Sequence, residues 1–107
     1  MIKYNNKKHN FGDIKMQEEK LNFHIDNLYE IILKLKTKQD CKSLFEDLCT
    51  YKEVEQMALR AYAAKLFMQG RTYHEIIEET KLSSATISRV SRAVSHGSGG
   101  YKKFMGG

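Results

Sequence analysis

Residues 72–94, TYHEIIEETKLSSATISRVSRAV, decide the fold of this chain. They contain a short helical pattern over about 73–80 and most of a second over about 84–96, joined by the turn Lys81-Leu82-Ser83. Two short helices joined by a tight turn are typical of a helix-turn-helix. The alternative is a helical hairpin in a bundle whose basic face is accidental.

Apolar residues mark the buried side of this segment. Ile76 and Ile77 lie on the first helix, and Leu82 is expected to pack between the two helices. Ser83 is a favourable N-cap for the second helix. In that helix three residues fall within about 60° of one another and predict a buried stripe: Ile87, Val90 and Val94.

The opposite face of the second helix has small side chains first and basic ones later: Ala85, Ser88, Arg89, Arg92 and His96. Small side chains let the first turn approach base edges, and arginine reaches phosphate or guanine. This layout predicts a DNA recognition helix. Two positions depart from the common pattern, because Lys81 stands where glycine is usual at φ > 0 and Ile77 where a small residue is usual. Each is tolerable at about 1 kcal/mol of strain.

The segment before the helix-turn-helix predicts a buried helix over about 51–69, ended by Gly70. Its apolar residues surround most of the helix: Val54, Met57, Ala58, Leu59, Ala61, Tyr62, Ala63, Ala64, Leu66, Phe67 and Met68. A helix that is apolar on most sides is buried on most sides. A few short helices of one chain cannot cover it so completely, so the pattern predicts a symmetric dimer.

Three Thr-x-x-acid sequences predict helix starts by the capping-box rule: 37–40, 50–53 and 72–75. A first helix is predicted over about 17–36, with a heptad-like stripe suited to packing along another long helix: Leu21, Ile25, Leu28, Ile32 and Leu35. A second helix over about 38–49 places Cys41 and Cys49 on its apolar face. We expect packed, reduced thiols there rather than a metal site.

The net charge of +5 lies entirely at the C-terminal end of the 107 residues. Residues 1–80 carry thirteen Lys or Arg and thirteen acids, whereas 81–107 carry five Lys or Arg and no acid. A one-sided basic end suits a polyanion-binding surface, and a solvated tail is the alternative.

Length and composition limit the class of protein. The chain is long enough for one domain, expected over residues 16–96 and flanked by a flexible arm, 1–15, and a mobile, Gly-rich basic tail, 97–107. No apolar run approaches the roughly 20 residues of a membrane span, and no signal peptide is recognised, so we expect a cytoplasmic protein. The histidines His9, His24, His74 and His96 lack metal or catalytic spacing. We therefore expect no enzyme, metal or cofactor.

Five stretches carry a family resemblance: LYEIILKLKT (28–37), FEDLCT (45–50), GRTYHEI (70–76), ATISRV (85–90) and GSGGY (97–101). Over about residues 18–101 the chain resembles the tryptophan-repressor family, most closely its YerC/YecD-type members. The resemblance implies an all-α, Trp-repressor-like helical bundle, an intertwined homodimer whose first three helices form one core, and sequence-specific binding of double-stranded DNA.

The resemblance also implies site residues. DNA contacts map to Ser84, Ala85 and Ser88, and to His74 and Ile77 on the preceding helix, although the repressor has lysine at the position of Ile77. With the two arginines of the recognition helix, the predicted DNA-binding set is His74, Ser84, Ala85, Ser88, Arg89 and Arg92.

Co-repressor contacts map to Arg60, Thr86 and Arg89. Val90 stands where the repressor has glycine beside the indole ring, and Ala93 where it has a hydroxyl. A site that loses such contacts loses affinity heavily, so we expect that tryptophan is not the effector. Two alternatives remain for Arg60: it binds a small anionic effector, or it forms an intersubunit salt bridge.

These observations favour a dimeric transcriptional regulator, a repressor that occupies its operator. A protein-interaction adaptor that docks through the helix-turn-helix is the alternative from another class. A detached DNA-binding module of a recombinase ranks lower, because no catalytic domain accompanies it.

Overall fold

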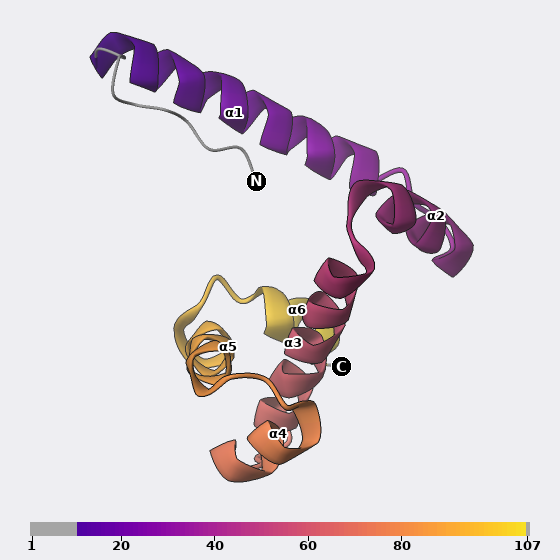
Figure 1. Cartoon of the computed structure of the whole chain (residues 1–107), viewed down its shortest axis with the longest axis vertical. Coiled ribbons are helices and arrows are strands. Elements are labelled where there is room, and N and C mark those ends of the chain that lie inside the picture. Colours follow the sequence, from indigo (N-terminus) through magenta and orange to yellow (C-terminus); the bar gives the residue numbers. More distant parts are fainter. Residues whose placement is uncertain (1–10, 107) are drawn as a thin grey trace. The chain divides into compact units, whose positions relative to one another are not determined.

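The computed structural model describes the backbone of residues 11–106 and the side chains from residue 17 onward. This part of the chain is helical throughout, without a strand (Figure 1). Its helices are α1 (Phe11–Ile32), α2 (Lys38–Leu48), α3 (Tyr51–Met68), α4 (Tyr73–Thr80), α5 (Ser84–His96) and α6 (Gly100–Met105). The predicted all-α class is confirmed, and the bounds of α2, α3, α4 and α5 agree with the sequence prediction to within one residue.

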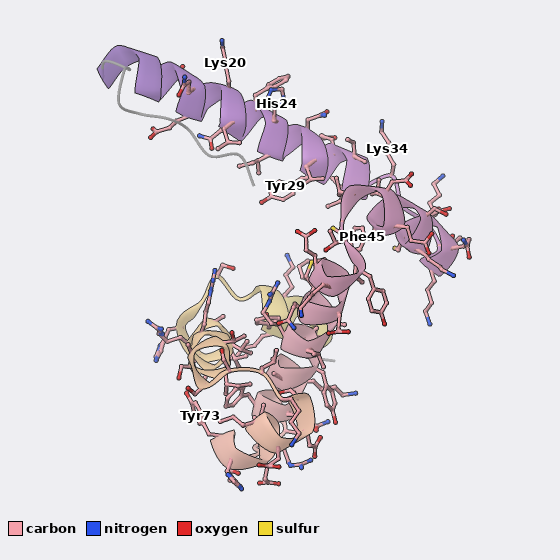
Figure 2. All side chains as sticks on the ribbon, in the orientation of Figure 1. Lys20, His24, Tyr29, Lys34, Phe45 and Tyr73 are labelled. Carbon is pink, nitrogen blue, oxygen red and sulfur yellow. The ribbon has the colours of Figure 1, made fainter. Side chains whose placement is uncertain are left out.

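The chain forms two compact units, divided between Ser43 and Leu44 within α2. The sequence predicts one domain over 16–96. In the first unit none of the described side chains of α1 is buried. Large apolar side chains are exposed there, with Phe23 at 70% and Leu33 at 78%. Figure 2 shows Lys20 and His24 on one side of α1 and Tyr29 on the other.

The bounds of α1 correct the sequence prediction of 17–36. The helix already begins at Phe11, so residues 11–15 of the predicted flexible arm are helical, and residues 1–10 lie outside the described part. The helix ends at Ile32 because the amides of Lys34 and Leu35 bond three residues back, in a tight final turn. The next amides, of Lys36 and Thr37, donate to Asp40 and belong to the start of α2.

All three predicted capping boxes are present. The hydroxyl of Thr50 accepts from the amide of Glu53 at 3.1 Å, and Glu53 accepts from the amide of Thr50 at 2.9 Å. The bond from the amide of Thr50 holds the pKa of Glu53 below its usual value. The same reciprocal bonds join Thr37 to Asp40 and Thr72 to Glu75. Satisfying amides that have no helical partner fixes where each helix begins.

The cysteines are less covered than the sequence suggests. Both are free thiols, but Cys41 is exposed and Cys49 half-buried. The prediction of packed thiols is therefore wrong for Cys41 within one chain, because α2 has no buried residue of its own.

The second unit holds the buried core. It contains seven apolar residues from α3, the helix-turn-helix and the turn: Ala63, Ala64, Leu66, Ile76, Leu82, Ile87 and Val90. Helix α3 contacts α4, α5 and α6, and in Figure 1 α5 is seen end-on beside α3, so the two helices cross steeply. Only the C-terminal half of α3 is buried by its own chain, whereas Val54, Met57 and Leu59 are half-buried.

Part of the predicted Gly-rich tail is a helix. Gly99, at φ 93°, turns the chain into α6, a conformation that costs glycine little. Tyr101 and Met105 then pack against the core. The prediction of a mobile tail over 97–107 is thus wrong for α6, because these side chains bury apolar surface that offsets the cost of ordering the segment.

Thr80 is the buried polar residue of the helix-turn-helix. Its hydroxyl donates to the carbonyl of Ile76 at 2.8 Å and accepts from the amide of Leu82 at 3.3 Å. We expect Thr80→Val, which keeps the shape, to lower the free energy of unfolding by about 1–2 kcal/mol, because the amide of Leu82 loses its acceptor. Thr80→Ser keeps both bonds and should lose less. Urea unfolding at fixed protein concentration measures both, and equal losses would contradict the explanation.

Candidate nucleic-acid interface

The turn between α4 and α5 adopts a left-handed conformation. Lys81 has φ 57°, the only positive φ of a non-glycine residue in the described part of the chain. Lys81 thus adopts the left-handed conformation for which glycine is usual, as the sequence predicted. The amide of Lys81 donates to the carbonyl of Ile77 at 2.8 Å, and Leu82 is buried between the helices as expected. The turn therefore fixes where α5 leaves α4.

The start and the inner face of α5 agree with the sequence pattern. Ser83 is the N-cap, and its hydroxyl accepts from the amide of Thr86 at 3.1 Å. Ile87 and Val90 are buried, and Val94 packs against the core. The helix is thus anchored by one side, and its other side is open.

The predicted DNA-binding residues are all open to solvent. Five lie on α5 and one on α4, and all are exposed: Ser84, Ala85, Ser88, Arg89, Arg92 and His74. Arg89 and Arg92 form no ion pair with any acid in the described residues. Their guanidinium groups are therefore available to an anionic partner. Ile77, by contrast, packs against the core and is not an open contact.

The acids nearest to this surface are compensated. Glu78 on α4 pairs with Lys81 at 3.1 Å, and this hydrogen bond holds the pKa of Glu78 below its usual value. Glu75 and Glu79 on the same helix pair with Arg71. From Lys81 to residue 106 the chain has no acid. The arrangement therefore offers cations and small polar side chains, and the described residues contain no cluster that could hold a metal ion.

The sequence of the chain matches a known protein family. The model of the Trp repressor protein family matches residues 23–106. The chain belongs to the Trp repressor family. Members of this family are DNA-binding regulators rather than enzymes.

Relatives of the Trp repressor type cover most of the chain. The uncharacterized protein YerC of Bacillus subtilis (strain 168) is 42% identical over 88 residues, which are 81% of this chain and 85% of YerC. The chain is therefore a YerC-type member of the Trp repressor family.

Two solved structures have the same fold. A TrpR-like protein from Eubacterium eligens ATCC 27750 is 39% identical, with a TM-score of 0.71, over 75% of this chain and 82% of its own. A proposed Trp repressor from Staphylococcus aureus is 38% identical, with a TM-score of 0.75, over 84% of this chain and 91% of its own. The Trp-repressor-like fold predicted from the sequence is thus confirmed.

The three residues at Trp-repressor effector positions have different surroundings in the described part of the single chain. Arg60 is half-buried and lines a surface pocket of about 380 Å³ with Cys49, Lys52, Glu53, Gln56 and Met57. Thr86 accepts a hydrogen bond from the hydroxyl of Ser83 at 3.0 Å, next to the N-cap of α5. Arg89 is exposed on α5. Among the described residues no acid pairs with Arg60.

Val90 lies on the buried inner side of α5, as the stripe of apolar residues predicted. Its side chain is 2% exposed and lies in the core beside Ile87. Its methyl groups therefore fill the gap between α5 and the rest of the unit. Ala93 lines a separate shallow pocket with Ser98, Gly100, Tyr101 and Phe104.

Two features of the unit were missed by the sequence reasoning. Arg71 precedes Glu75 by four residues and Glu79 by eight, a spacing that places both acids on one face of α4. Tyr101 and Met105 are also four residues apart, so they share a face of α6. In each case the spacing was visible in the sequence. For Tyr101 and Met105 the many glycines of the C-terminal segment favoured a mobile tail.

No helix in the described part of the chain is both long and apolar enough to cross a membrane.

Proposed function

We propose that the chain is a dimeric repressor that binds a specific sequence of double-stranded DNA through α5, without tryptophan as its effector. The main support for this proposal is the exposed face of α5, where Arg89 and Arg92 have no acidic partner among the described residues. In this reading the arginines contact the DNA backbone or guanine, and Ser84, Ala85 and Ser88 approach base edges.

A mutational test separates backbone contacts from base contacts. Arg92→Ala should weaken binding to every duplex and flatten the slope of log K against log salt by about 0.9, the value of one phosphate contact. Ser88→Ala should instead change the preference among sequences more than the total affinity. Fluorescence anisotropy over a range of salt concentrations, on duplexes enriched from a random pool, measures both.

Ser95→Ala is the matched control, since Ser95 is exposed near the end of the same helix and the substitution changes no charge. An unchanged salt slope in Arg92→Ala would mean that this face does not meet the backbone. If the wild-type protein enriches no duplex and shows no salt-sensitive shift, the DNA-binding function is wrong and the adaptor function replaces it.

The dimer is supported by apolar surface that the single chain leaves uncovered. On α1 and directly after it, four large apolar side chains are exposed beyond the predicted stripe: Phe23, Tyr29, Ile31 and Leu33. In the second unit Leu48, Tyr51 and Tyr62 are exposed. Large exposed apolar patches mark association surfaces. A second copy of the chain is the partner that we propose for them.

Tryptophan is expected not to bind. Val90 fills the space beside α5, and Ala93 offers no hydroxyl. Isothermal titration with millimolar tryptophan, with and without DNA, should give no binding heat and no change in DNA affinity.

A clear heat with micromolar affinity, or DNA binding that appears only with tryptophan, would overturn this prediction. Val90→Gly with Ala93→Ser is the variant in which to look for a reopened site. The pair is expected to be less stable than the wild type, because glycine within a helix costs roughly 1 kcal/mol relative to alanine.

A further inference from the structure

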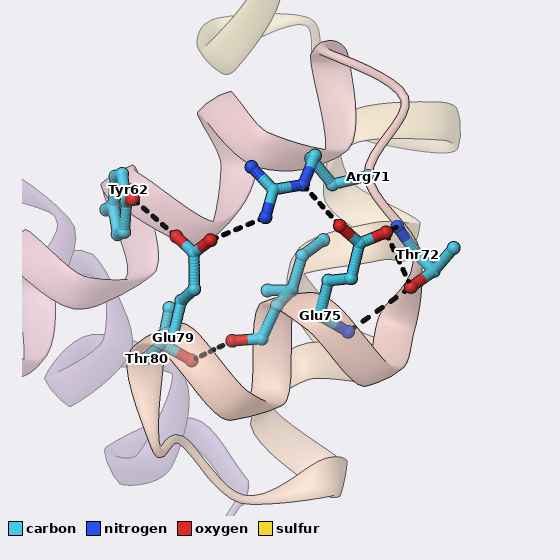
Figure 3. A network of polar contacts seen from close by, with 7 residues as sticks. Tyr62, Arg71, Thr72, Glu75, Glu79 and Thr80 are labelled. Atoms are coloured by element: carbon cyan, nitrogen blue, oxygen red, sulfur yellow. Dashed lines mark hydrogen bonds and ion pairs between the residues drawn. The ribbon is translucent and has the colours of Figure 1, made fainter.

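A polar network joins α3 to the first helix of the helix-turn-helix. The Arg71 network consists of Tyr62 on α3, Arg71 after α3, and Glu75 and Glu79 on α4. Nε of Arg71 donates to Oε2 of Glu75 at 2.7 Å, and Nη2 of Arg71 donates to Oε1 of Glu79. The hydroxyl of Tyr62 donates to the other oxygen of Glu79 at 2.6 Å. Figure 3 shows the guanidinium group of Arg71 between the two carboxylates.

The network restrains the rotation of a short helix. Helix α4 has eight residues, too few for a helix to be stable by itself in water. Ile76 anchors α4 in the core, but apolar contacts have no preferred direction. The planar guanidinium group has donors in fixed directions, so two bonds from Arg71 define how α4 is rotated about its axis. Because three residues join α4 to α5, that rotation also affects where α5 begins.

The network also compensates charge where DNA is proposed to bind. Residues 73–96 carry three acids, all on α4, and three Lys or Arg. The bond from Tyr62, and then that from Arg71, lower the pKa of Glu79, and Arg71 lowers the pKa of Glu75. Both carboxylates are therefore charged at neutral pH. Without the cation opposite them they would repel DNA phosphates.

We propose that Arg71, whose amide donates to the carbonyl of Leu66 at the end of α3, is a positioning residue for DNA binding, which fixes α4 relative to α3 and compensates Glu75 and Glu79 without touching DNA itself. The inference rests on the proposed DNA-binding function. It assigns to the connection between α3 and α4, outside the helix-turn-helix, a direct part in setting the geometry of the DNA-binding surface.

The test compares two variants that each lose one positive charge, Arg71→Gln and Lys65→Gln. Lys65 is exposed on α3 and takes no part in the Arg71 network. Three quantities are measured: the affinity for a duplex enriched by the wild-type protein, the salt slope of that affinity, and hydrogen exchange of the α4 amides in the free protein. The amides of Ile76 and Lys81, both hydrogen-bonded, report on α4 and its end.

Arg71→Gln should bind about tenfold more weakly than Lys65→Gln, because α4 is displaced and carries uncompensated charge. Its α4 amides should exchange faster, and its salt slope should equal that of Lys65→Gln. Adding Glu79→Gln to Arg71→Gln should restore part of the affinity. Arg71→Lys, which keeps the charge but not the planar donors, should be intermediate in affinity and exchange.

Equal affinities of Arg71→Gln and Lys65→Gln would overturn the inference and leave the DNA-binding function intact. A salt slope flatter by about 0.9 with unchanged α4 exchange would also overturn it, since Arg71 would then contact a phosphate itself. If the wild-type protein enriches no duplex, both the proposed DNA-binding function and this inference are wrong. If Arg71→Gln does not fold, Arg71→Lys is compared with Lys65→Gln instead. Equal affinities of these two variants for the duplex would overturn the inference.

Discussion

Replacing Ile87 by alanine is expected to lower the free energy of unfolding by about 2–5 kcal/mol, the usual cost of truncating a fully buried isoleucine. Ile87 has no exposed surface and lies at the centre of the small core, beside Ile76 and Val90. Alanine favours helix more than isoleucine does, so the loss comes from packing and not from helix propensity. Since a domain is stable by roughly 5–15 kcal/mol in total, the change removes a large share.

Ser95→Ala on the same helix is again the control, because Ser95 is exposed and an exposed substitution changes stability by only about 0.5 kcal/mol. Urea or thermal unfolding at one fixed protein concentration measures both variants, since the stability of a dimer depends on concentration. A loss in Ile87→Ala no larger than that in Ser95→Ala would mean that α5 is not packed by this stripe.

Replacing Ile25 by aspartate is expected to weaken the proposed dimer by at least about a hundredfold, because a carboxylate without a partner is costly to bury. Ile25 lies on the heptad-like stripe of α1, and 37% of its surface is exposed in the single chain. Symmetry places the new charge in the interface twice. Light scattering and circular dichroism at micromolar concentration should show loss of the dimer together with loss of helix.

Asn27→Asp introduces the same charge at an exposed position almost opposite to Ile25 on α1, and it should leave the dimer intact. A dimer unaffected by Ile25→Asp would place the interface elsewhere. A folded wild-type monomer at micromolar concentration would remove the dimer from the proposed function, since each chain would then satisfy its apolar faces by itself.

Local patterns were sufficient for most helix bounds. The Thr-x-x-acid boxes set the starts of α2, α3 and α4, because the hydrogen bonds that they make involve residues only three apart. The start and end of α1 were wrong by several residues, since no such box precedes it and the bonds that start α2 end it. The exposed face of α5 was predicted because the spacing of Ile87, Val90 and Val94 defines its opposite side.

By itself the sequence determined the helices, the helix-turn-helix, its left-handed turn at Lys81 and the side of α5 that stays open. Each depends on residues a few positions apart, and the period of a helix converts their spacing into a direction. The tertiary structure alone decided that Tyr62 reaches Glu79 across 17 residues, that Tyr101 and Met105 order α6, and that Cys41 stays exposed. These features depend on how separate helices pack against one another, which the spacing of residues along one helix does not specify.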